Sequence, residues 1–246
     1  MKMDIMTGSR YGPMKICQLS GTQIFFFNWK QNIPDDGYCH SKGGFMKIIG
    51  INASPRKKAN TQSLVEAVLG GASETGAETR LVNLRDLTIN GCLGCEGCKK
   101  QLGKCVQKDE LTTLLQEMAM YDAIVMGTPV YWYHVSAQFK MLVDRLYSFM
   151  EFGENPETGE TEIRSVFPTG KKFLFLISRG DPEPARVFPH FYQYLDEWLN
   201  LIPLSLGAGS YEFFHQYGAD IDRKSAQNDP ELIDRARKAG IELASI

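Results

Sequence analysis

MKIIGINASPRKKANTQS, residues 46–63, contains an apolar run followed by a polar loop. Ile48–Ala53 is a short apolar run of the kind that forms a buried β-strand. The polar residues Ser54–Ser63 come next. After them, apolar residues recur with the period of an α-helix at Leu64, Val65, Val68, Leu69 and Ala72. This order predicts the first strand, loop and helix of a parallel α/β domain.

The same alternation continues along the chain. Further strands are predicted at Thr79–Val82, Ala123–Gly127, Lys172–Ile177 and Leu204–Glu212. Further helices are predicted after the capping residue Asp109 and at Val135–Met150, Pro184–Leu199 and Pro230–Ala244. Apolar strands alternating with helices predict an α/β fold, in which helices cover both faces of a parallel sheet. Five strands and five helices favour the flavodoxin-like doubly wound sheet with strand order 2-1-3-4-5.

Two segments interrupt this pattern. A cysteine-rich loop follows the second predicted strand, and the long polar stretch Gly153–Thr169 precedes the fourth. We expect the polar stretch to form a surface insertion or a lid.

The composition fits one folded domain with a substantial core. The chain has 246 residues, of which 43% are hydrophobic. Its net charge is −2, and no stripe of Lys and Arg with interleaved aromatics is present, which argues against nucleic acid as a partner. The apolar run at residues 23–27 is far too short to cross a bilayer. We therefore expect a soluble cytoplasmic protein that does not enter a membrane.

Residues 1–45 do not share the pattern of the rest. They contain scattered Gly, Pro, Asn and Cys and one aromatic burst at Ile24–Trp29, without the ordered parts of a signal peptide. The codons of Lys42–Phe45 can contain a purine-rich ribosome-binding sequence, which would make Met46 the translation start. We expect residues 1–45 to be a non-native or disordered extension and residues 46–246 to be the folded domain. The alternative is a genuine extension particular to this protein.

The loop after the first strand carries groups suited to an anion. Hydroxyls, an amide, a guanidinium and the N–H groups of a helix start gather where the helix dipole is positive. Ordinary capping is the alternative, because Ser63 with Glu66 fits a capping box and Asn60 or Thr61 can also cap. Capping does not account for the cations at residues 56–58. The loop therefore predicts a phosphate site, and it matches neither a Walker A nor a G-x-G-x-x-G motif.

Two further loops reach the same edge of the predicted sheet. Thr128–His134 follows the third strand and contains three adjacent aromatic residues that can border a flat ring, while the Thr128 hydroxyl can reach the polar rim of that ring. The alternative is that these aromatics fill the core or a dimer interface. Ser178–Asp181 follows the fourth strand and is small and polar enough to approach a planar ligand. His134 and His190 have no partner visible in the sequence, which favours a structural or surface role over catalysis.

Four cysteines lie close together with the spacing C-x2-C-x2-C-x6-C: Cys92, Cys95, Cys98 and Cys105. Glycines at 91, 94 and 97 allow the backbone to wrap tightly around a bound group. Soft thiolate ligands favour a [4Fe–4S] cluster or zinc over a hard cation. The spacing suits a cluster better, because zinc usually takes two separated Cys-x2-Cys pairs. Free thiols or a disulfide are the remaining alternatives.

In this order the motifs resemble the flavodoxin-like NADPH-dependent FMN reductase family, and within it the iron–sulfur flavoprotein branch. The resemblance covers residues 46–246 and rests on the loop after the first strand, the four cysteines, and the segments Thr128–Tyr131, Val135–Ala137, Lys140 and Asp144-Arg145. It implies that the FMN phosphate is held by Ser54, Arg56, Asn60 and Thr61. It implies that the isoalloxazine is bordered by Pro129, Val130, Tyr131 and Trp132 and closed on its other side by Ser178, Arg179 and Gly180. The four cysteines would hold a [4Fe–4S] cluster.

The resemblance implies an FMN-dependent NAD(P)H oxidoreductase that passes electrons from reduced flavin to a quinone, a nitro compound or another small-molecule acceptor, with the cluster as a one-electron route. No side chain is expected to act as a catalytic nucleophile or base. One alternative is a ferredoxin-linked electron carrier without NAD(P)H activity, and another is a flavin-free module with structural zinc. Flavoproteins of this fold are often homodimers or homotetramers, and the sequence leaves open the choice between NADPH and NADH.

Overall fold

The computed structural model describes residues 45–155, 158–159, 161–182, 189–219 and 224–245. Residues 1–44 lie outside this set, so the predicted division of the chain into an extension and a folded domain stays a prediction. The predicted start of a helix at Pro184 also lies outside the described residues. Among the helices that are described, none is long and apolar enough to span a bilayer.

The elements follow one another in a regular α/β order. The strands are β1 (Lys47–Asn52), β2 (Glu78–Asn83), β3 (Ala123–Tyr131), β4 (His134–Val135), β5 (Met150–Glu154), β6 (Thr161–Ser165), β7 (Lys172–Ser178) and β8 (Ser210–Gln216). The α-helices are α1 (Asn60–Glu74), α2 (Glu110–Met118), α3 (Ala137–Arg145), α4 (Pro189–Ser205) and α5 (Pro230–Ala244). Short 3₁₀ turns are η1 (Leu84–Asp86), η2 (Gly97–Lys100) and η3 (Leu146–Phe149).

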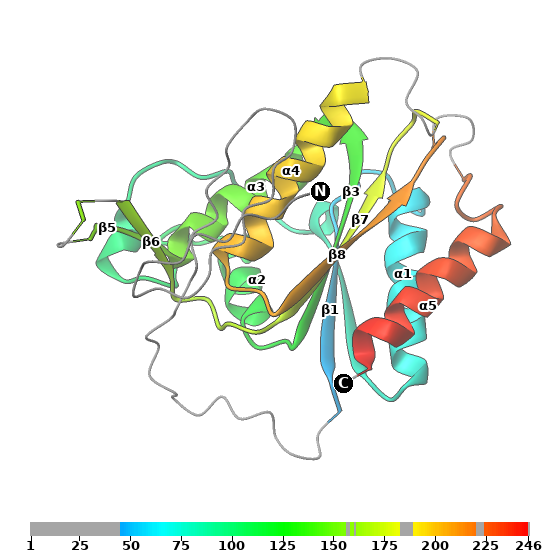
Figure 1. The fold of residues 1–246 in the computed structure, drawn as a ribbon, viewed down its shortest axis with the longest axis horizontal. Helices are drawn as coiled ribbons and strands as arrows, with labels where there is room; N and C mark the ends of the chain where they lie inside the picture. The colour runs from blue at the N-terminus through cyan, green and yellow to red at the C-terminus, as the bar shows by residue number, and fades with distance from the viewer. Residues whose placement is uncertain (1–44, 156–157, 160, 183–188, 220–223, 246) are drawn as a thin grey trace, which may run out of the picture. The chain divides into compact units, whose positions relative to one another are not determined.

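The central sheet has the predicted topology. Its parallel strands lie in the order β2-β1-β3-β7-β8 (Figure 1). Because β7 and β8 are the fourth and fifth parallel strands, this order confirms the predicted 2-1-3-4-5 arrangement. The strand order reverses between β1 and β3, and ligands of such sheets bind at the carboxyl edge beside that reversal. The sheet also contains β4, antiparallel to β3, which was not predicted.

Helices cover both faces of the sheet, with α1 and α5 on one side and α2, α3 and α4 on the other (Figure 1). On the α1–α5 side, Ile48 of β1, Val125 of β3 and Leu176 of β7 lie in a buried apolar cluster. Ile49 and Ile177 point to the other face and join a larger cluster there. This alternation along each strand explains why the strands are apolar without interruption.

Helices α1 and α5 cross at two glycines. A Cβ atom on Gly71 would lie 1.9 Å from the backbone oxygen of Arg237, and one on Gly240 would lie 1.9 Å from that of Val68. No side chain fits at either position without separating the two backbones. The crossing therefore fixes α5 tightly against α1, the helix whose first turn borders the predicted phosphate loop.

The last predicted strand was misplaced. Strand β8 occupies Ser210–Gln216 rather than Leu204–Glu212, because helix α4 continues to Ser205 in spite of Pro203. Leu199, Ile202 and Leu206 keep the helical spacing and are all buried in the core. Burial of that apolar face outweighs the lost N–H of a proline close to the end of the helix.

Two other boundaries also differ from the sequence prediction. The helix expected over Val135–Met150 is the shorter α3, which continues as the 3₁₀ turn η3. The polar stretch Gly153–Thr169 was expected to be a surface insertion or a lid, and it contains the end of β5 and strand β6, which pair as an antiparallel hairpin. Within it Ile163 stands between the charged residues Glu162 and Arg164, an alternation that suits a strand better than a loop.

Candidate functional site

The carboxyl ends of three neighbouring strands bring the predicted FMN-binding segments together. In the parallel register Asn52 of β1 lies beside Gly127 of β3, and Pro129 of β3 lies beside Ser178 of β7. The loop after β1, the end of β3 and the residues after β7 therefore meet at one edge of the sheet, as predicted from their order in the sequence.

The loop between β1 and α1 leads into a helix without a side-chain cap. Helix α1 begins at Asn60, and its N-cap residue Ala59 makes no side-chain hydrogen bond to the first turn. Ser63 lies inside the helix, so it does not form the capping box that the sequence allowed. The first turn of α1 also lacks acidic residues. An uncapped, non-acidic helix start is suited to an anion.

Hydrogen bonds within the loop fix its backbone. The N–H of Ser54 donates to Asn52 Oδ1 at 3.1 Å, and the N–H of Arg56 donates to Ser54 Oγ at 3.3 Å. Ser54 is buried, whereas the side chains of residues 56–58 are exposed. The loop thus combines an ordered backbone with exposed positive charge.

Asn60 and Ser178 belong to one internal polar network. The Asn60 amide donates to Ser225 Oγ at 3.0 Å and accepts from the N–H of Ala226 at 3.1 Å. Gln216 donates to the same Ser225 oxygen at 2.9 Å and accepts from Ser178 Oγ at 2.9 Å. These contacts tie the start of α1 to the ends of β7 and β8. The roles of Asn60 and Ser178 as FMN ligands stay predictions.

Thr128 anchors the hairpin that the aromatic residues form. Strand β3 extends to Tyr131, so Thr128–Tyr131 belong to a strand and not, as predicted, to the following loop. The Thr128 hydroxyl accepts from the N–H of Ser136 at 3.1 Å and donates to the carbonyl of Pro129 at 3.0 Å. It therefore holds the end of β3 against the start of α3.

Trp132 and Tyr133 form the two-residue turn between β3 and β4. Their φ angles are +49° and +61°, the left-handed region that hairpin turns usually fill with Asn or Gly. The Trp132 side chain is 94% exposed, whereas the Tyr133 ring lies 5.1 Å from that of Phe191 on α4. An exposed aromatic ring on a strained turn thus stands at the edge where the flavin is expected.

Arg179 lies between two tyrosine rings. Its guanidinium is 4.4 Å from the ring centre of Tyr192 and 4.2 Å from that of Tyr217, and the residue is buried. The Tyr192 hydroxyl donates to the Asp181 carboxylate at 3.0 Å. Burial and this hydrogen bond raise the pKa of Tyr192 to about 12. Gly180, which stands between Arg179 and Asp181 in the sequence, is half-buried.

One acid–base pair close to Arg179 was missed by the sequence analysis. His215 Nε2 on β8 lies 3.5 Å from Asp196 Oδ2 on α4. Burial raises the pKa of Asp196 to about 6, although the positive charge of Arg179 opposes the rise. The two residues belong to different elements, and only the pairing of β8 with β7 beneath α4 brings them together.

Arg85 was also missed. It follows β2 within η1. Its guanidinium donates hydrogen bonds to the loop between β1 and α1 and to the first turn of α1. No motif surrounds it in the sequence, so only the pairing of β2 with β1 could have revealed its position.

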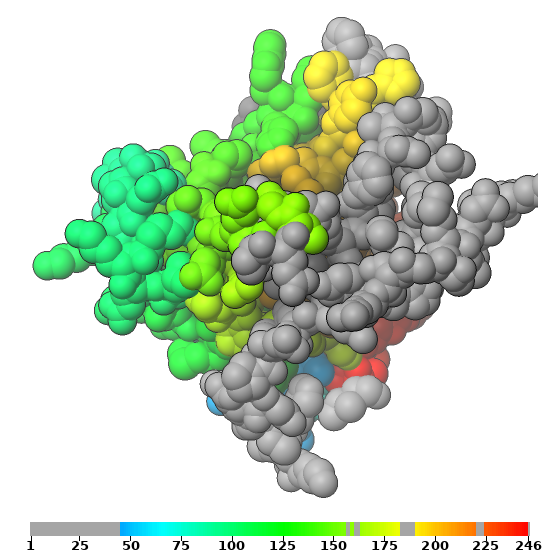
Figure 2. All heavy atoms as spheres, turned by 60° about the vertical axis from the view of Figure 1, so that its left-hand side comes forward, coloured from blue at the N-terminus to red at the C-terminus, as the bar shows by residue number. Residues whose placement is uncertain are grey.

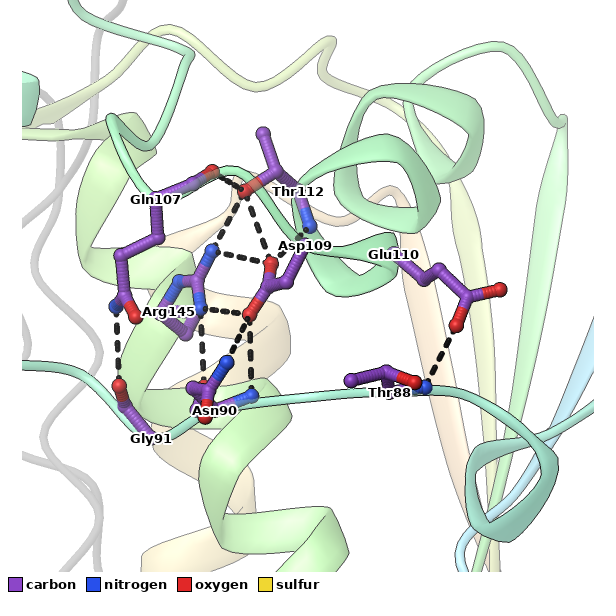
Figure 3. A network of polar contacts seen from close by, with 8 residues as sticks. All are labelled: Thr88, Asn90, Gly91, Gln107, Asp109, Glu110, Thr112 and Arg145. Carbon is purple, nitrogen blue, oxygen red and sulfur yellow. Dashed lines mark hydrogen bonds and ion pairs between the residues drawn. The ribbon is translucent and has the colours of Figure 1, made fainter.

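The cysteine segment, residues 92–105, is closed at its base by Arg145 and Asp109 (Figure 3). Arg145 donates to both carboxylate oxygens of Asp109, at 2.9 and 3.0 Å, and to the carbonyl of Asn90 at 2.9 Å. Gln107 donates to the carbonyl of Gly91 at 3.0 Å. The side chains of Gln107, Asp109 and Arg145 thus join the backbone just before Cys92 to the chain just after Cys105.

A lysine attaches the middle of the cysteine segment to the neighbouring turn. Lys99 Nζ donates to the carbonyl of Tyr147 at 2.8 Å and to that of Met150 at 2.5 Å. It also lies 3.5 Å from the centre of the Tyr147 ring.

The thiols themselves differ in exposure. Cys92 and Cys95 are exposed, Cys98 is buried and Cys105 is half-buried, and all four are free. Burial raises the pKa of Cys98; the positive charge of Lys99 opposes the rise, and Cys105 and Cys92 add to it. In Figure 2 the teal part of the chain, which includes this segment, stands out at the surface. A groove of about 670 Å³ runs past Cys105, lined also by Gln101, Lys104 and Thr113.

The described residues contain no group of three His, Cys, Asp or Glu side chains gathered as ligands of a single metal ion. The four thiols share one segment and are soft donors, so their chemistry fits an iron–sulfur cluster.

Comparison with protein families identifies residues 46–165 as similar to the family described as NADPH-dependent FMN reductase. An iron–sulfur flavoprotein of Methanocaldococcus jannaschii is 46% identical over 100 residues, which are 41% of this chain and 51% of that protein. One from Archaeoglobus fulgidus is 28% identical over 182 residues, 74% of this chain and 76% of that protein. The chain thus spans about half the length of the first relative.

Solved structures share the fold. The NAD(P)H:quinone oxidoreductase of Methanothermobacter marburgensis superposes with a TM-score of 0.67 at 19% identity, over 81% of this chain and 100% of that one. An FMN-dependent NADH-azoreductase of Bacillus anthracis superposes with a TM-score of 0.59 at 15% identity, over 81% and 100% of the two chains. At these identities the likeness concerns the architecture alone.

Proposed function

The chain belongs to the NADPH-dependent FMN reductase family, and we propose that it is an FMN-dependent oxidoreductase. When bound, FMN supplies hydride and single-electron chemistry, and the protein supplies binding and orientation. The observation that carries the proposal is the uncapped, non-acidic start of α1 beside the ordered loop of Ser54 and Arg56. A phosphate dianion fits this donor set, because N–H groups and cations face it without a competing carboxylate.

The ring of the cofactor would lie along the ends of β3 and β7. Pro129–Trp132 and Ser178–Gly180 would border it, since Pro129 and Ser178 are neighbours across the two strands. Thr128 would act mainly through the backbone that it holds in place, because its hydroxyl already contacts Ser136 and Pro129. The residues at this edge thereby position the ring and limit what can approach it.

Absorbance spectroscopy of the protein purified without air tests the flavin. Flavin bands and about one FMN per chain are expected, and a colourless protein that takes up no FMN would refute the proposal. Mixing the flavoprotein with NADPH and with NADH, while following flavin bleaching, tests whether either is the electron donor. Arg56→Ala should weaken FMN binding about tenfold or more, because a charge-assisted contact to phosphate would be lost.

We also propose that Cys92, Cys95, Cys98 and Cys105 hold a [4Fe–4S] cluster. Support comes from the soft donor set, the closed base of the segment and the name iron–sulfur flavoprotein carried by several relatives. Iron and acid-labile sulfide at about four of each per chain are expected after anaerobic reconstitution. Zinc without iron would instead assign the cysteines a structural role.

Electron delivery to a small acceptor, such as a quinone or a nitro compound, is the function that we favour. Exposure of the cysteine segment supports a second candidate, a carrier that exchanges electrons with a ferredoxin: Cys92 and Cys95 are exposed and Leu93 between them is 73% exposed. Rapid flavin reduction by NADPH or NADH supports the first candidate. Reduction by ferredoxin alone supports the second.

A further inference from the structure

The Arg85 side chain makes hydrogen bonds that hold the predicted phosphate loop, residues 54–63, in place. Its side chain is 9% exposed, and its Nε lies 3.6 Å from the Asp86 carboxylate. Nη1 donates to the carbonyls of Ser54 and Arg56, each at 3.4 Å, and Nη2 donates to Gln62 Oε1 at 2.9 Å. One guanidinium from the end of β2 therefore contacts the start of the loop, its middle and the first turn of α1.

Gln62 extends this contact to the end of the loop. Its Oε1 also accepts from the N–H of Lys58 at 2.9 Å, and its Nε2 donates to Glu66 at 2.7 Å. Lys58 has a φ of +49°, a conformation that is unfavourable for a residue with a Cβ atom. The Arg85–Gln62 pair thus holds the strained residue that directs the chain into α1.

These contacts determine which way the peptide groups of the loop face. In a planar trans peptide the C=O and the following N–H point in opposite directions. With the carbonyl of Arg56 directed at Arg85, the N–H of Lys57 is directed away from it. The carbonyl oxygens of Ser54 and Arg56, which are the negative ends of their peptide dipoles, therefore point toward Arg85 and away from the side where an anion would bind.

We propose that Arg85 is a positioning residue for the FMN phosphate. It does not contact the cofactor but holds the loop in its phosphate-binding conformation. The inference rests on the proposed FMN site and adds to it a residue from η1, the turn that follows β2. Because the action concerns the phosphate alone, loss of Arg85 weakens the binding of FMN but not of riboflavin, which has the same ring without the phosphate.

Fluorescence titration of the flavin-free full-length protein with FMN and with riboflavin tests the proposal. Arg85→Gln should weaken FMN binding about tenfold, equivalent to about 1.4 kcal/mol, and change riboflavin binding less than about twofold. Arg85→Lys should fall between wild type and Arg85→Gln, because one ammonium cannot reach all three acceptors in the planar geometry of a guanidinium. Arg80→Gln is the matched control, since Arg80 is a partly exposed arginine of β2 whose guanidinium pairs with Glu117 at 2.8 Å.

Gln62→Leu provides a second variant if Arg85→Gln does not fold. It removes the shared acceptor from α1 and should also reduce FMN binding selectively. Equal losses for FMN and riboflavin, or unchanged FMN binding in either variant, would overturn the role of Arg85. Failure of the wild-type protein to bind either flavin would instead refute the proposed function.

Discussion

Arg145 and Asp109 form a bidentate ion pair whose side chains are 0% and 4% exposed. Asp109 is the N-cap of α2, where it accepts from the N–H of Thr112, and Arg145 is the last residue of α3. Burial raises the pKa of Asp109, but hydrogen bonds from Arg145, Thr112 and Asn90 outweigh it and hold the pKa well below its usual range. One pair therefore connects two helices and the base of the cysteine segment.

Arg145→Leu should lower the free energy of unfolding by about 3–5 kcal/mol, because the Asp109 carboxylate would stay buried without its cation. Urea denaturation at neutral pH measures the change. Arg80→Gln removes a partly exposed arginine from a surface ion pair and should cost less than about 1 kcal/mol. Similar midpoints for the two variants would show that the buried pair contributes little.

Asp196 should make stability depend on pH in the direction opposite to that of most carboxylates. Its folded pKa of about 6 lies above the unfolded value of about 3.9, so the folded state binds the extra proton between these values. Stability from this group is therefore present at about pH 4 and is lost as the pH rises through about 6. Asp196→Asn should remove this loss. Parallel stability profiles of wild type and variant between pH 4 and pH 8 would contradict the shift.

Gly71→Ala should destabilise the protein by about 1–3 kcal/mol or more, because the new Cβ would press on the backbone of α5. Gly70→Ala is a control in the same helix, where a Cβ would meet nothing within 4 Å. That change should be neutral or stabilise the helix by up to about 1 kcal/mol. Thermal unfolding of both variants measures the difference, and equal midpoints would argue against the close crossing.

Trp132→Gly should widen the range of quinones reduced while FMN stays bound. The substitution removes a ring that is 94% exposed at the flavin edge, and glycine adopts the left-handed turn conformation without strain. Values of kcat/KM for small and bulky quinones should change unequally, with the larger gain for the bulky ones. Tyr194→Ala, which removes another exposed ring, is the control and should leave the ratio unchanged.

Cys95→Ser should abolish the cluster but not the flavin, because the cysteine segment and the phosphate loop follow different strands. A serine oxygen is a harder and poorer ligand for iron than a thiolate. Iron and sulfide per chain should fall together, whereas FMN per chain should hold. Cys39→Ser, outside the cysteine segment, should keep its iron. Full iron content in the Cys95 variant would remove that residue from the ligand set.

Local patterns located β1, β2, β3 and β7, though not all of their ends, and did not predict the contacts between the loops that follow them. The apolar run Ile48–Ala53 identified β1 almost to its ends, and Asp109 was correctly expected to cap α2. Its pairing with Arg145 was not predicted, because ion pairs across a fold leave no periodic signal. The same holds for Arg85, whose acceptors lie in the loop after β1 and on α1.

Strained backbone conformations could not be predicted from the sequence either. Nothing in the sequence Tyr131-Trp132-Tyr133-His134 indicates a two-residue turn, since Trp and Tyr are typical of strands. Pairing of β4 with β3 imposes that turn, and contact of Tyr133 with Phe191 accompanies it. The end of α4 was misjudged for a related reason, because tertiary burial overrode the helix-ending tendency of Pro203.

The contacts of Asn60 and the glycine crossing have a consequence for the protein during its synthesis. Residues 225–244 supply both the hydrogen-bond partners of Asn60 and the helix that packs on α1. A nascent chain still attached to the ribosome lacks them until that stretch has emerged from the exit tunnel. Asn60, although made much earlier, therefore gains these hydrogen-bond partners, and α1 its packing against α5, only after residues 225–244 have been made.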